Sequence, residues 1–210
     1  TGVPVRAAFF AVPAALPPLA PLRLLVLGGS QGARQVNELV PAAVARLLGL
    51  LGGGVALRVL HQAGAKNVEE TLAAYRAAGV AEASGIVEVV PFLDDIAGAM
   101  ASSHLLVPRA GAITVAEICV ASRAALFLPL TIAQAHQVDN ARLLADAGAA
   151  ELLTGEAATP DALAARLGAL LGDGERLARM GRAARALARP GAVAAIADRL
   201  TELAERRVGR

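Results

Sequence analysis

Short apolar runs alternate with longer amphipathic stretches along most of the chain. The apolar runs are dense in Leu, Val, Ile or Ala and lack the alternation of a half-exposed strand. This pattern is typical of strands that are buried on both faces of a parallel sheet. We therefore predict strands at residues 22–27, 55–61, 86–90, 104–107, 124–128 and 150–153.

The stretches between these runs repeat their apolar positions at the helical period of 3.6 residues. In residues 33–50, for example, Val36, Val40, Val44 and Leu47 fall on one face. Further helices are predicted at residues 67–78, 94–101, 113–121, 135–147, 160–171, 175–188 and 192–206. Strands that alternate with helices indicate an α/β fold, a doubly wound, Rossmann-like parallel sheet with ligand loops at the carboxyl ends of its strands.

We expect one domain over residues 22–190, between two segments of different character. Residues 1–21 include a long uncharged stretch with Pro13, Pro17, Pro18 and Pro21, which cannot form a membrane-spanning helix and reads as an extended linker. Because the first residue is Thr1 and not Met, we expect further chain upstream of it. Residues 191–210 are predicted to form an arginine-rich terminal helix.

Composition narrows the class of protein. Hydrophobic residues make up 56% of the chain and aromatic residues 2%, so we expect a core of Ala, Leu and Val and no disorder. A net charge of +2 gives no reason to expect a nucleic-acid partner. The C-terminal arginines alternate with Ala, Leu and Glu, which favours a solvated face first and contact with an anionic membrane surface second.

Several reactive residue types have structural interpretations. Cys119 is the single cysteine, so no intrachain disulfide or cysteine metal cluster can form, and its apolar neighbours indicate core packing in a reducing, cytoplasmic setting. His61 and His104 lie at strand ends without metal-ligand spacing, and we interpret both as structural. Asp94 and Asp95 precede a helix and are interpreted as a cap, with a metal site as the weaker alternative.

The first candidate ligand site is the Gly-Gly-Ser-Gln-Gly-Ala sequence at residues 28–33, where a strand meets a helix. Glycines there allow close approach to a ligand, and the N–H groups of the helix N-terminus favour a phosphate or diphosphate. A tight structural turn is about equally plausible. Ser30 and Ala33 break the dinucleotide-binding pattern, and no Gly-Lys-Ser/Thr follows, so neither an NAD enzyme nor a P-loop NTPase is supported.

The second candidate site is residues 109–117, which follow a strand and open a helix. After Arg109, Gly111 and Ala112 permit close approach of a ligand, and Thr114 is in the first turn of the helix. Glu117 lies on nearly the same helix face as Thr114, where a carboxylate can bind both ribose hydroxyls. Thr114 and Glu117 also have the spacing of a capping box, and taken alone the motif favours that interpretation.

Two further sets complete the candidate chemistry. Phe92 follows a strand and can pack against a flat base. His136, Gln137 and Asn140 offer hydrogen-bonding groups at the start of a helix, a complement that suits a sugar. Because no acidic partner is positioned beside His136, we interpret this set as recognition and not as base catalysis.

Taken in order, these motifs resemble the C-terminal domain of the MurG family of peptidoglycan N-acetylglucosaminyltransferases. The resemblance extends from about Gly2 to about Ala150. It rests on GGSQGAR at 28–34 with Asn37, HQ at 61–62, PFLDD at 91–95, RAGAITVAE at 109–117 and HQVDNA at 136–141. No single motif is specific to the family, but the ordered set is.

The resemblance implies a role for each matched position. Phe92 and Leu93 would hold the uracil, Leu93 through its backbone, and Glu117 would bind the ribose hydroxyls. The diphosphate region would be lined by Ser30, Ile113 and Thr114. Gln31, Gly32, Arg109 and Gly111 are further candidate donor-binding residues. His136 and Gln137 would read the sugar, and Arg6 would be a donor-site arginine at the domain junction.

The family also implies a reaction and partners. The C-terminal half of such a two-domain (GT-B) enzyme binds UDP-N-acetylglucosamine (UDP-GlcNAc), and an acceptor hydroxyl displaces UDP with inversion and without a tightly bound cofactor or metal. An N-terminal domain would bind the lipid-linked acceptor and supply the attacking base. The full-length protein would contact the cytoplasmic face of the bacterial membrane peripherally. Residues 1–21 would link the two domains, and residues 191–210 would cross back to the other one.

We therefore expect this chain to bind the donor but to show little transferase activity alone. Two alternatives stay open. One is a GT-B transferase that uses a different UDP-sugar or acceptor, and the other is a non-catalytic nucleotide-binding domain. Titration with UDP-GlcNAc, UDP-glucose and UDP separates them.

Overall fold

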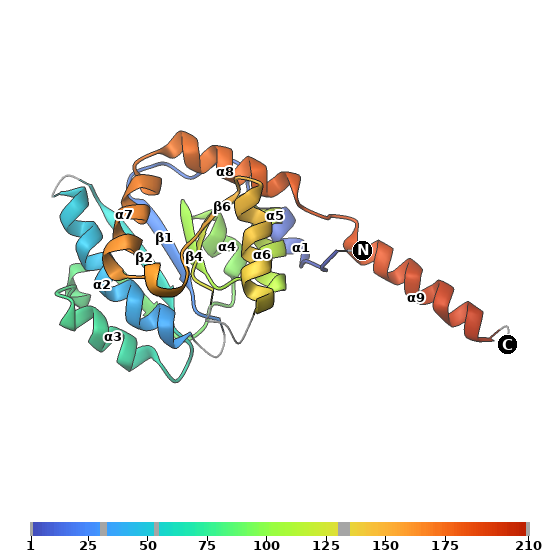
Figure 1. Ribbon diagram of the computed structural model, residues 1–210, viewed down its shortest axis with the longest axis horizontal. Helices are drawn as coiled ribbons and strands as arrows, with labels where there is room; N and C mark the ends of the chain where they lie inside the picture. The colour runs from blue at the N-terminus through green and yellow to red at the C-terminus, as the bar shows by residue number, and fades with distance from the viewer. Residues whose placement is uncertain (1, 30–32, 53–54, 130–134, 209–210) are drawn as a thin grey trace.

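The structure is a computed structural model that describes residues 2–29, 33–52, 55–129 and 135–208. At its centre is a six-stranded parallel sheet in the order β3-β2-β1-β4-β5-β6 (Figure 1). The strands are β1 (Leu22–Leu27), β2 (Leu57–Gln62), β3 (Val87–Val90), β4 (Leu105–Pro108), β5 (Ala124–Phe127) and β6 (Ala150–Leu152). The chain runs outward from β1 to β3 and restarts at β4 beside β1, which places a topological switch point between β1 and β4.

Helices cover both faces of this sheet, so the predicted fold class is confirmed, with small shifts at the ends of the predicted elements. One face carries α2 (Arg34–Leu51), α3 (Val68–Ala77) and α7 (Pro160–Leu171). The other carries α1 (Ala7–Phe10), α4 (Ile96–Ala101), α5 (Ala112–Ala121) and α6 (Ala135–Asp146). Two short 3-10 helices, η1 (Glu82–Ser84) and η3 (Gly155–Ala157), and the helices α8 (Gly174–Ala186) and α9 (Ala192–Val208) complete the described elements.

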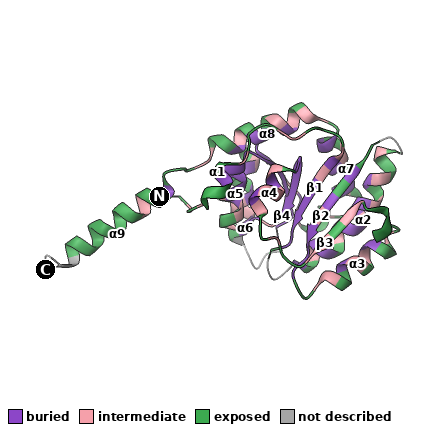
Figure 2. Ribbon diagram, turned by 180° about the vertical axis from the view of Figure 1, so that it is seen from behind, coloured by how far each residue is buried: buried purple, intermediate pink, exposed green. Residues whose placement is uncertain are grey.

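The sheet separates two apolar cores. Leu24 and Val26 of β1 face the core beneath α2 and α7, whereas Leu25 and Leu27 face the core beneath α4 and α5. This alternation follows from the two-residue period of a strand. Every residue of β4 and β5 is buried, as Figure 2 shows, which explains why these strands read as continuous apolar runs.

The N-terminal segment is not extended throughout. Residues Ala7–Phe10 form the helix α1, so the prediction of an extended linker is wrong for this turn. The physical reason is burial: one helical turn directs the Phe9 side chain into the core beside α5, where it is fully buried. That residues 1–21 join two domains stays a prediction.

Arg123 holds this segment against the sheet. Its side chain is fully buried before β5, and burial lowers its pKa without removing the positive charge. The guanidinium donates hydrogen bonds to backbone carbonyl oxygens of the N-terminal segment and of the ends of α4 and α5. These belong to Pro13 (3.0 Å), Ala15 (3.5 Å), Met100 (2.8 Å), Ala101 (3.1 Å), Ala121 (3.2 Å) and Ser122 (3.3 Å). No sequence pattern predicted this contact set.

His104 makes a second attachment. Its Nδ1 accepts a hydrogen bond from the backbone N–H of Arg23 at 2.9 Å, so the ring proton lies on Nε2. Nε2 donates to the carbonyl oxygens of Pro17 and Pro18, at 3.2 and 3.1 Å. Burial lowers the pKa of His104, which favours this neutral tautomer. The structural interpretation of His104 is confirmed.

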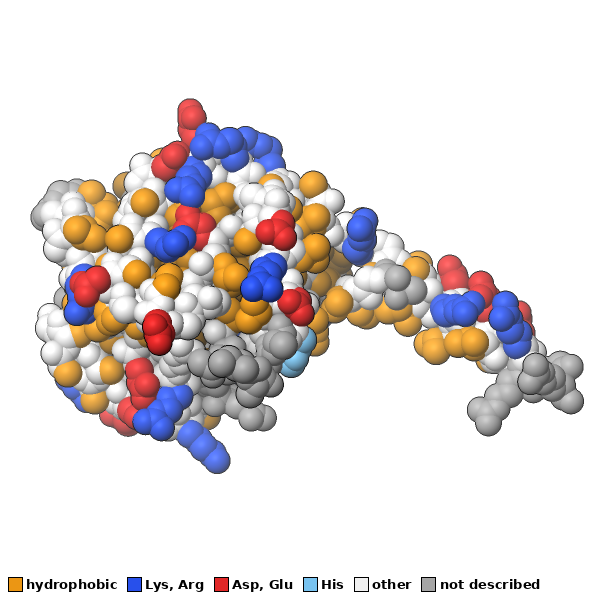
Figure 3. Space-filling model, in the orientation of Figure 1, with side chains coloured by type: hydrophobic (Ala, Val, Ile, Leu, Met, Phe, Trp, Pro, Cys, Tyr) orange, Lys and Arg blue, Asp and Glu red, His pale blue; other side chains and the backbone are white. Residues whose placement is uncertain are grey.

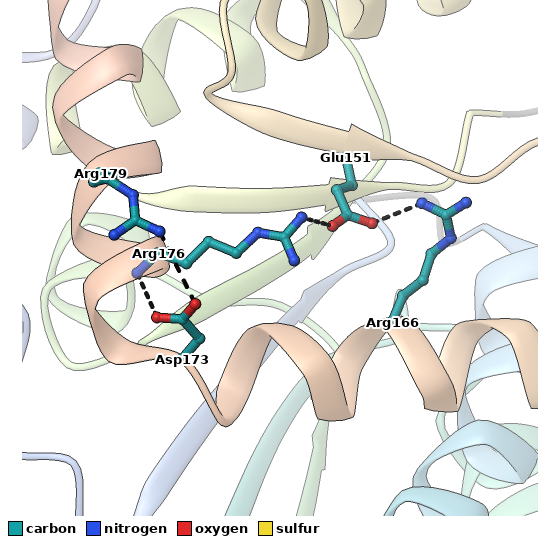
Figure 4. Close-up of polar contacts among 5 residues, drawn as sticks. All are labelled: Glu151, Arg166, Asp173, Arg176 and Arg179. Atoms are coloured by element: carbon teal, nitrogen blue, oxygen red, sulfur yellow. Dashed lines mark hydrogen bonds and ion pairs between the residues drawn. The ribbon is translucent and has the colours of Figure 1, made fainter.

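The arginines of α8 are partly paired. Figure 4 shows Glu151 of β6 accepting hydrogen bonds from Arg166 (2.7 Å) and Arg176 (2.6 Å), while Asp173 caps α8 and lies 4.0 Å from Arg179. These contacts tie the edge strand to α7 and α8. Arginine and acidic side chains also lie together over α8 in Figure 3, as expected for a solvated face.

Helix α9 extends away from the body of the domain (Figure 1) and exposes Val193, Leu200 and Leu203. That this helix crosses to a second domain stays a prediction. None of the helices in the described part of the chain combines the length and the apolar character that a bilayer-spanning helix needs.

Candidate functional site

A pocket of about 410 Å³ opens at the carboxyl ends of β1, β2 and β4, at the switch point of the sheet. It brings together three segments that are distant in the sequence: the turn after β1, the loop after β3 and the β4–α5 junction. Its lining residues are Leu27, Gly28, Gly29, Gln62, Phe92, Ile96, Arg109, Gly111, Ile113, Thr114, Glu117 and Gln137.

The turn after β1 needs glycine for two different reasons. The backbone N–H of Gly28 donates to the carbonyl oxygen of Gln62 at 3.0 Å, and a Cβ on Gly28 would lie 2.7 Å from that oxygen. Gly29 has a φ of +82°, a left-handed conformation that favours glycine. The structural interpretation of this turn therefore holds for both residues, although both also line the pocket. Ser30, Gln31 and Gly32 lie outside the described residues.

The N-terminus of α5 forms the opposite wall. Gly111 is the N-cap, with φ −65° and ψ 143°, and Thr114 lies inside the first turn of the helix. The capping-box interpretation of Thr114 and Glu117 is therefore wrong, because a capping threonine precedes its helix. The unpaired N–H groups of this first turn carry partial positive charge at the pocket wall.

Glu117 lies one turn further along α5, lines the pocket and is only 7% exposed. Burial raises the pKa of its carboxyl group, and Arg6, whose Nη2 lies 3.5 Å from Oε1, acts against that rise. The Arg6 guanidinium also stacks over the Phe9 ring, 5.2 Å from its centroid. The N-terminal segment thus brings an exposed arginine to the edge of the site without lining the pocket.

The pocket carries further polar groups at the end of β4 and the start of α6. Arg109 follows β4, and partial burial lowers its pKa while leaving it a cation. Gln137 is buried at the start of α6 and also lines the pocket. A cation beside a helix N-terminus makes this end of the pocket attractive to a phosphate or diphosphate.

The structure does not bring every predicted residue into the pocket. Phe92 lines it and is 52% exposed, but Leu93 packs partly into the core behind it. His136 is exposed at the start of α6. The Asn140 side chain donates to the Ala110 carbonyl oxygen at 3.1 Å, and Asn140 lines a separate apolar groove on the other side of α5.

Three lining residues were not predicted, Leu27, Gln62 and Ile96. Gln62 is the last residue of β2, and the rule that ligands bind at carboxyl ends of parallel strands was sufficient to identify it. Ile96 opens α4 beside Phe92, and only the folded chain shows that it reaches the pocket.

His61 faces away from the pocket into a closed hydrogen-bond network. Asn37 donates from Nδ2 to the Ala63 carbonyl oxygen (2.9 Å), so its Oδ1 accepts from His61 Nε2 (3.1 Å). Nδ1 then accepts from the Tyr75 hydroxyl (3.0 Å). Burial lowers the pKa of His61 to about 3 and raises that of Tyr75. The structural interpretation of His61 is confirmed.

The remaining structural interpretations also hold. Cys119 is buried in the core and its thiol pKa is raised to about 11 by burial, so it packs and is not a reactive thiolate. Asp95 is the N-cap of α4 and accepts from the Gly98 N–H at 2.8 Å. Across the described ranges, no three His, Cys, Asp or Glu side chains gather as a metal-ligand set.

Comparison with known proteins places this chain in a family. UDP-N-acetylglucosamine–N-acetylmuramyl-(pentapeptide) pyrophosphoryl-undecaprenol N-acetylglucosamine transferase of Caulobacter vibrioides is 45% identical over 196 residues, which are 93% of this chain and 52% of that protein. The enzyme with the same description from Methylibium petroleiphilum is 43% identical over 210 residues, covering 97% of this chain and 54% of that protein. The chain thus spans about half the length of these curated relatives.

Solved structures agree in fold. The crystal structure of Acinetobacter baumannii MurG aligns with 87% of this chain, and the alignment covers 50% of the MurG chain, with a TM-score of 0.75 and 38% identity. A glycosyltransferase from Rickettsia africae matches 86% of this chain and 49% of its own at 12% identity and a TM-score of 0.63, which shows the shared fold alone. The family model described as the glycosyltransferase family 28 C-terminal domain matches residues 23–198. This chain belongs to that family.

Proposed function

We propose that this chain binds UDP-GlcNAc in the switch-point pocket as the donor-binding half of an inverting glycosyltransferase. The whole enzyme would transfer GlcNAc to a lipid-linked N-acetylmuramyl-pentapeptide, converting lipid I to lipid II in peptidoglycan synthesis. The single observation that carries this proposal is the meeting of Glu117, Arg109 and the α5 N-terminus in one pocket. The described activity of relatives that are 43–45% identical supports the choice of donor.

The donor would lie across the pocket with its base near Phe92 and the backbone of Leu93. Glu117 would accept hydrogen bonds from the ribose hydroxyls, because a buried carboxylate beside a single exposed arginine has accepting capacity left over. The diphosphate would sit between the Gly28–Gly29 turn, continued by Ser30, Gln31 and Gly32, and the start of α5 at Gly111, Ile113 and Thr114.

Arg109 lines the same end of the pocket and would meet the diphosphate charge. The GlcNAc group would extend toward Gln137, with His136 and Asn140 at its periphery. Arg6 would contact the donor from the N-terminal segment, within reach of Glu117.

In the reaction, an acceptor hydroxyl attacks C1 of GlcNAc, the bond from C1 to the diphosphate oxygen breaks, and UDP leaves with the negative charge. Preorganised N–H groups at the start of α5 and the Arg109 cation would stabilise that charge. No described residue is positioned as the attacking base, which we assign to the acceptor-binding half of the enzyme. We assign that half also the contact with the lipid acceptor and the cytoplasmic face of the bacterial membrane.

Calorimetric titration of this chain with UDP-GlcNAc, UDP-glucose and UDP tests the proposal. We expect UDP-GlcNAc and UDP to bind, UDP-GlcNAc to be preferred over UDP-glucose, and turnover of a lipid acceptor to be negligible. Preference for UDP-glucose would assign the chain to a different transferase activity. Failure of both UDP and UDP-GlcNAc to bind at millimolar concentration would contradict the proposal, and measurable turnover would contradict the assignment of the base to another half.

A further inference from the structure

Gln62 lies at the floor of the pocket, next to His61 but on the opposite face of the sheet. Alternation along β2 puts Val59 and His61 toward α2 and α3, and Leu60 and Gln62 toward α4. In the register of the sheet, Gln62 is level with Leu27 of β1. Its side chain therefore stands between the two strands whose following loops form the Gly28–Gly29 turn and the Phe92 wall.

The Gln62 carboxamide opens onto the pocket and has no hydrogen-bond partner among the described residues. The residue is 2% exposed and lines the pocket, yet its side chain forms no hydrogen bond with the residues that the structure describes. Buried amides in native proteins are normally hydrogen-bonded, because desolvation without a partner costs free energy. The Gln62 amide is therefore available to hydrogen-bond a ligand in the pocket.

The backbone around Gln62 is held in place independently of its side chain. Its carbonyl oxygen accepts from the Gly28 N–H at 3.0 Å. The next residue, Ala63, donates from its N–H to Val90 at 3.0 Å and accepts from the Asn37 side chain at 2.9 Å. The amide thus projects from a rigid strand end, a placement that suits recognition.

We propose that the Gln62 carboxamide is a direct hydrogen-bonding contact for the nucleoside part of the ligand, on its base side. This inference rests on the proposed function, that the pocket binds a nucleoside diphosphate. Gln62 ends β2, which lies between β1 and β3, and Phe92 is in the loop that follows β3. Arg109 and the α5 N-terminus follow β4, on the far side of β1. An amide also offers a donor and an acceptor together, which matches the N–H and C=O groups of a pyrimidine edge better than an acceptor-only phosphate.

Replacement of Gln62 by Leu tests the contact. Calorimetric titration should show UDP and UMP binding roughly tenfold more weakly to Gln62→Leu than to the wild-type chain, since one hydrogen bond to the ligand is lost. Inorganic pyrophosphate should bind both proteins equally. Gln35→Leu, the same substitution on α2 outside the pocket lining, should leave all three affinities unchanged.

Stability provides the second readout. Because Gln62 has no partner among the described residues, Gln62→Leu should unfold at the same temperature as the wild type or higher. Equal UDP affinity in the variant and the wild type, or an equal loss for UDP and pyrophosphate, would overturn the inference. The inference would also be overturned if Gln62→Leu lowered the unfolding temperature and Gln62→Asn restored both the unfolding temperature and the UDP affinity. If the wild-type chain does not bind UDP at all, the proposed function fails first, which distinguishes the two failures.

Discussion

His61 and Gln62 are neighbours at the end of β2, and both residues are buried. They lie on opposite faces of the sheet, in two regions that differ in whether the polar side chains are hydrogen-bonded within the protein. On the α3 side, both ring nitrogens of His61 are hydrogen-bonded, to Tyr75 and Asn37. On the pocket side, the Gln62 amide has no partner among the described residues. We infer that the first region serves the fold and the second serves the ligand.

Arg123 and Glu117 repeat the contrast for charged groups. The guanidinium of Arg123 is surrounded by backbone carbonyl oxygens of the protein itself. Among the described residues, Glu117 forms an ion pair with the exposed Arg6, at 3.5 Å. Burial raises the pKa of Glu117 in spite of that arginine, because a buried charge is poorly solvated. Substitutions in the first region should therefore change stability, and substitutions in the second should change ligand affinity.

The largest effect is expected for Arg123→Leu. This change leaves carbonyl oxygens of the N-terminal segment and of the last turn of α4 buried without a donor. We therefore expect a loss of about 3–5 kcal/mol in the free energy of unfolding. Urea denaturation measures it. Arg185→Leu, on the partly exposed α8, is the comparison and should cost much less. A loss below about 1 kcal/mol for Arg123→Leu would mean that the segment is held by apolar contacts alone.

His61 predicts a pH dependence of stability. Its folded pKa of about 3 lies below the unfolded value of 6.5, so the unfolded chain takes up a proton that the folded protein does not. Stability from this residue is present above pH 6.5 and decreases as the pH falls, by up to about 1.4 kcal/mol per pH unit. Unfolding measured between pH 7 and pH 5 should show a smaller decrease for His61→Gln. Identical pH dependence in the two proteins would contradict a neutral, buried His61.

Glu117 predicts a pH dependence of affinity. Ribose hydroxyls are bound by the carboxylate, and burial raises the pKa of this group in the free protein. The advantage of the wild type over Glu117→Gln in UDP affinity should therefore be full at neutral pH. It should shrink as the pH falls through the raised pKa, by up to about tenfold per pH unit. Titrations of the wild type and of Glu117→Gln at several pH values separate protonation of Glu117 from protonation of the UDP phosphate, because phosphate protonation affects the two proteins equally.

The smallest effect is expected for Phe92. The ring is half-exposed, so Phe92→Ala should weaken UDP by about 1 kcal/mol through lost stacking on the base and leave stability nearly unchanged. Phe10→Ala removes an exposed ring outside the pocket and is the matched control. If both substitutions leave UDP affinity unchanged, Phe92 does not contact the base.

The order of elements was predictable because it depends on local periodicity. The apolar runs at β1, β4 and β5 and the small residues after β1 and β4 were enough to predict the sheet and the edge at which the pocket opens. Thr114 and Glu117 show the limit: their spacing fits both a capping box and a ligand site. Only the start of α5 at Ala112, which places Thr114 within the helix, rules out the capping box.

Contacts between distant residues could not be predicted. Arg123 reaches Pro13 across 110 positions of the sequence, and Phe9 is buried by a helix far along the chain. Gln62 could have been predicted as a pocket residue, because it is the last residue of β2, at the edge of the sheet where the pocket opens. Its lack of a partner, however, depends on every side chain around it and emerges only in the folded chain.

The most direct test of the account is a double-mutant cycle between Glu117 and the ribose. Calorimetric titration would compare UDP with 2′-deoxy-UDP, on the wild-type chain and on Glu117→Ala. Removal of the 2′-hydroxyl should weaken binding to the wild type roughly tenfold, since a hydrogen bond to a charged group is lost, and should have no effect on Glu117→Ala. Equal losses on both proteins would contradict the assignment of Glu117 to the ribose, and with it the placement of the nucleotide in this pocket.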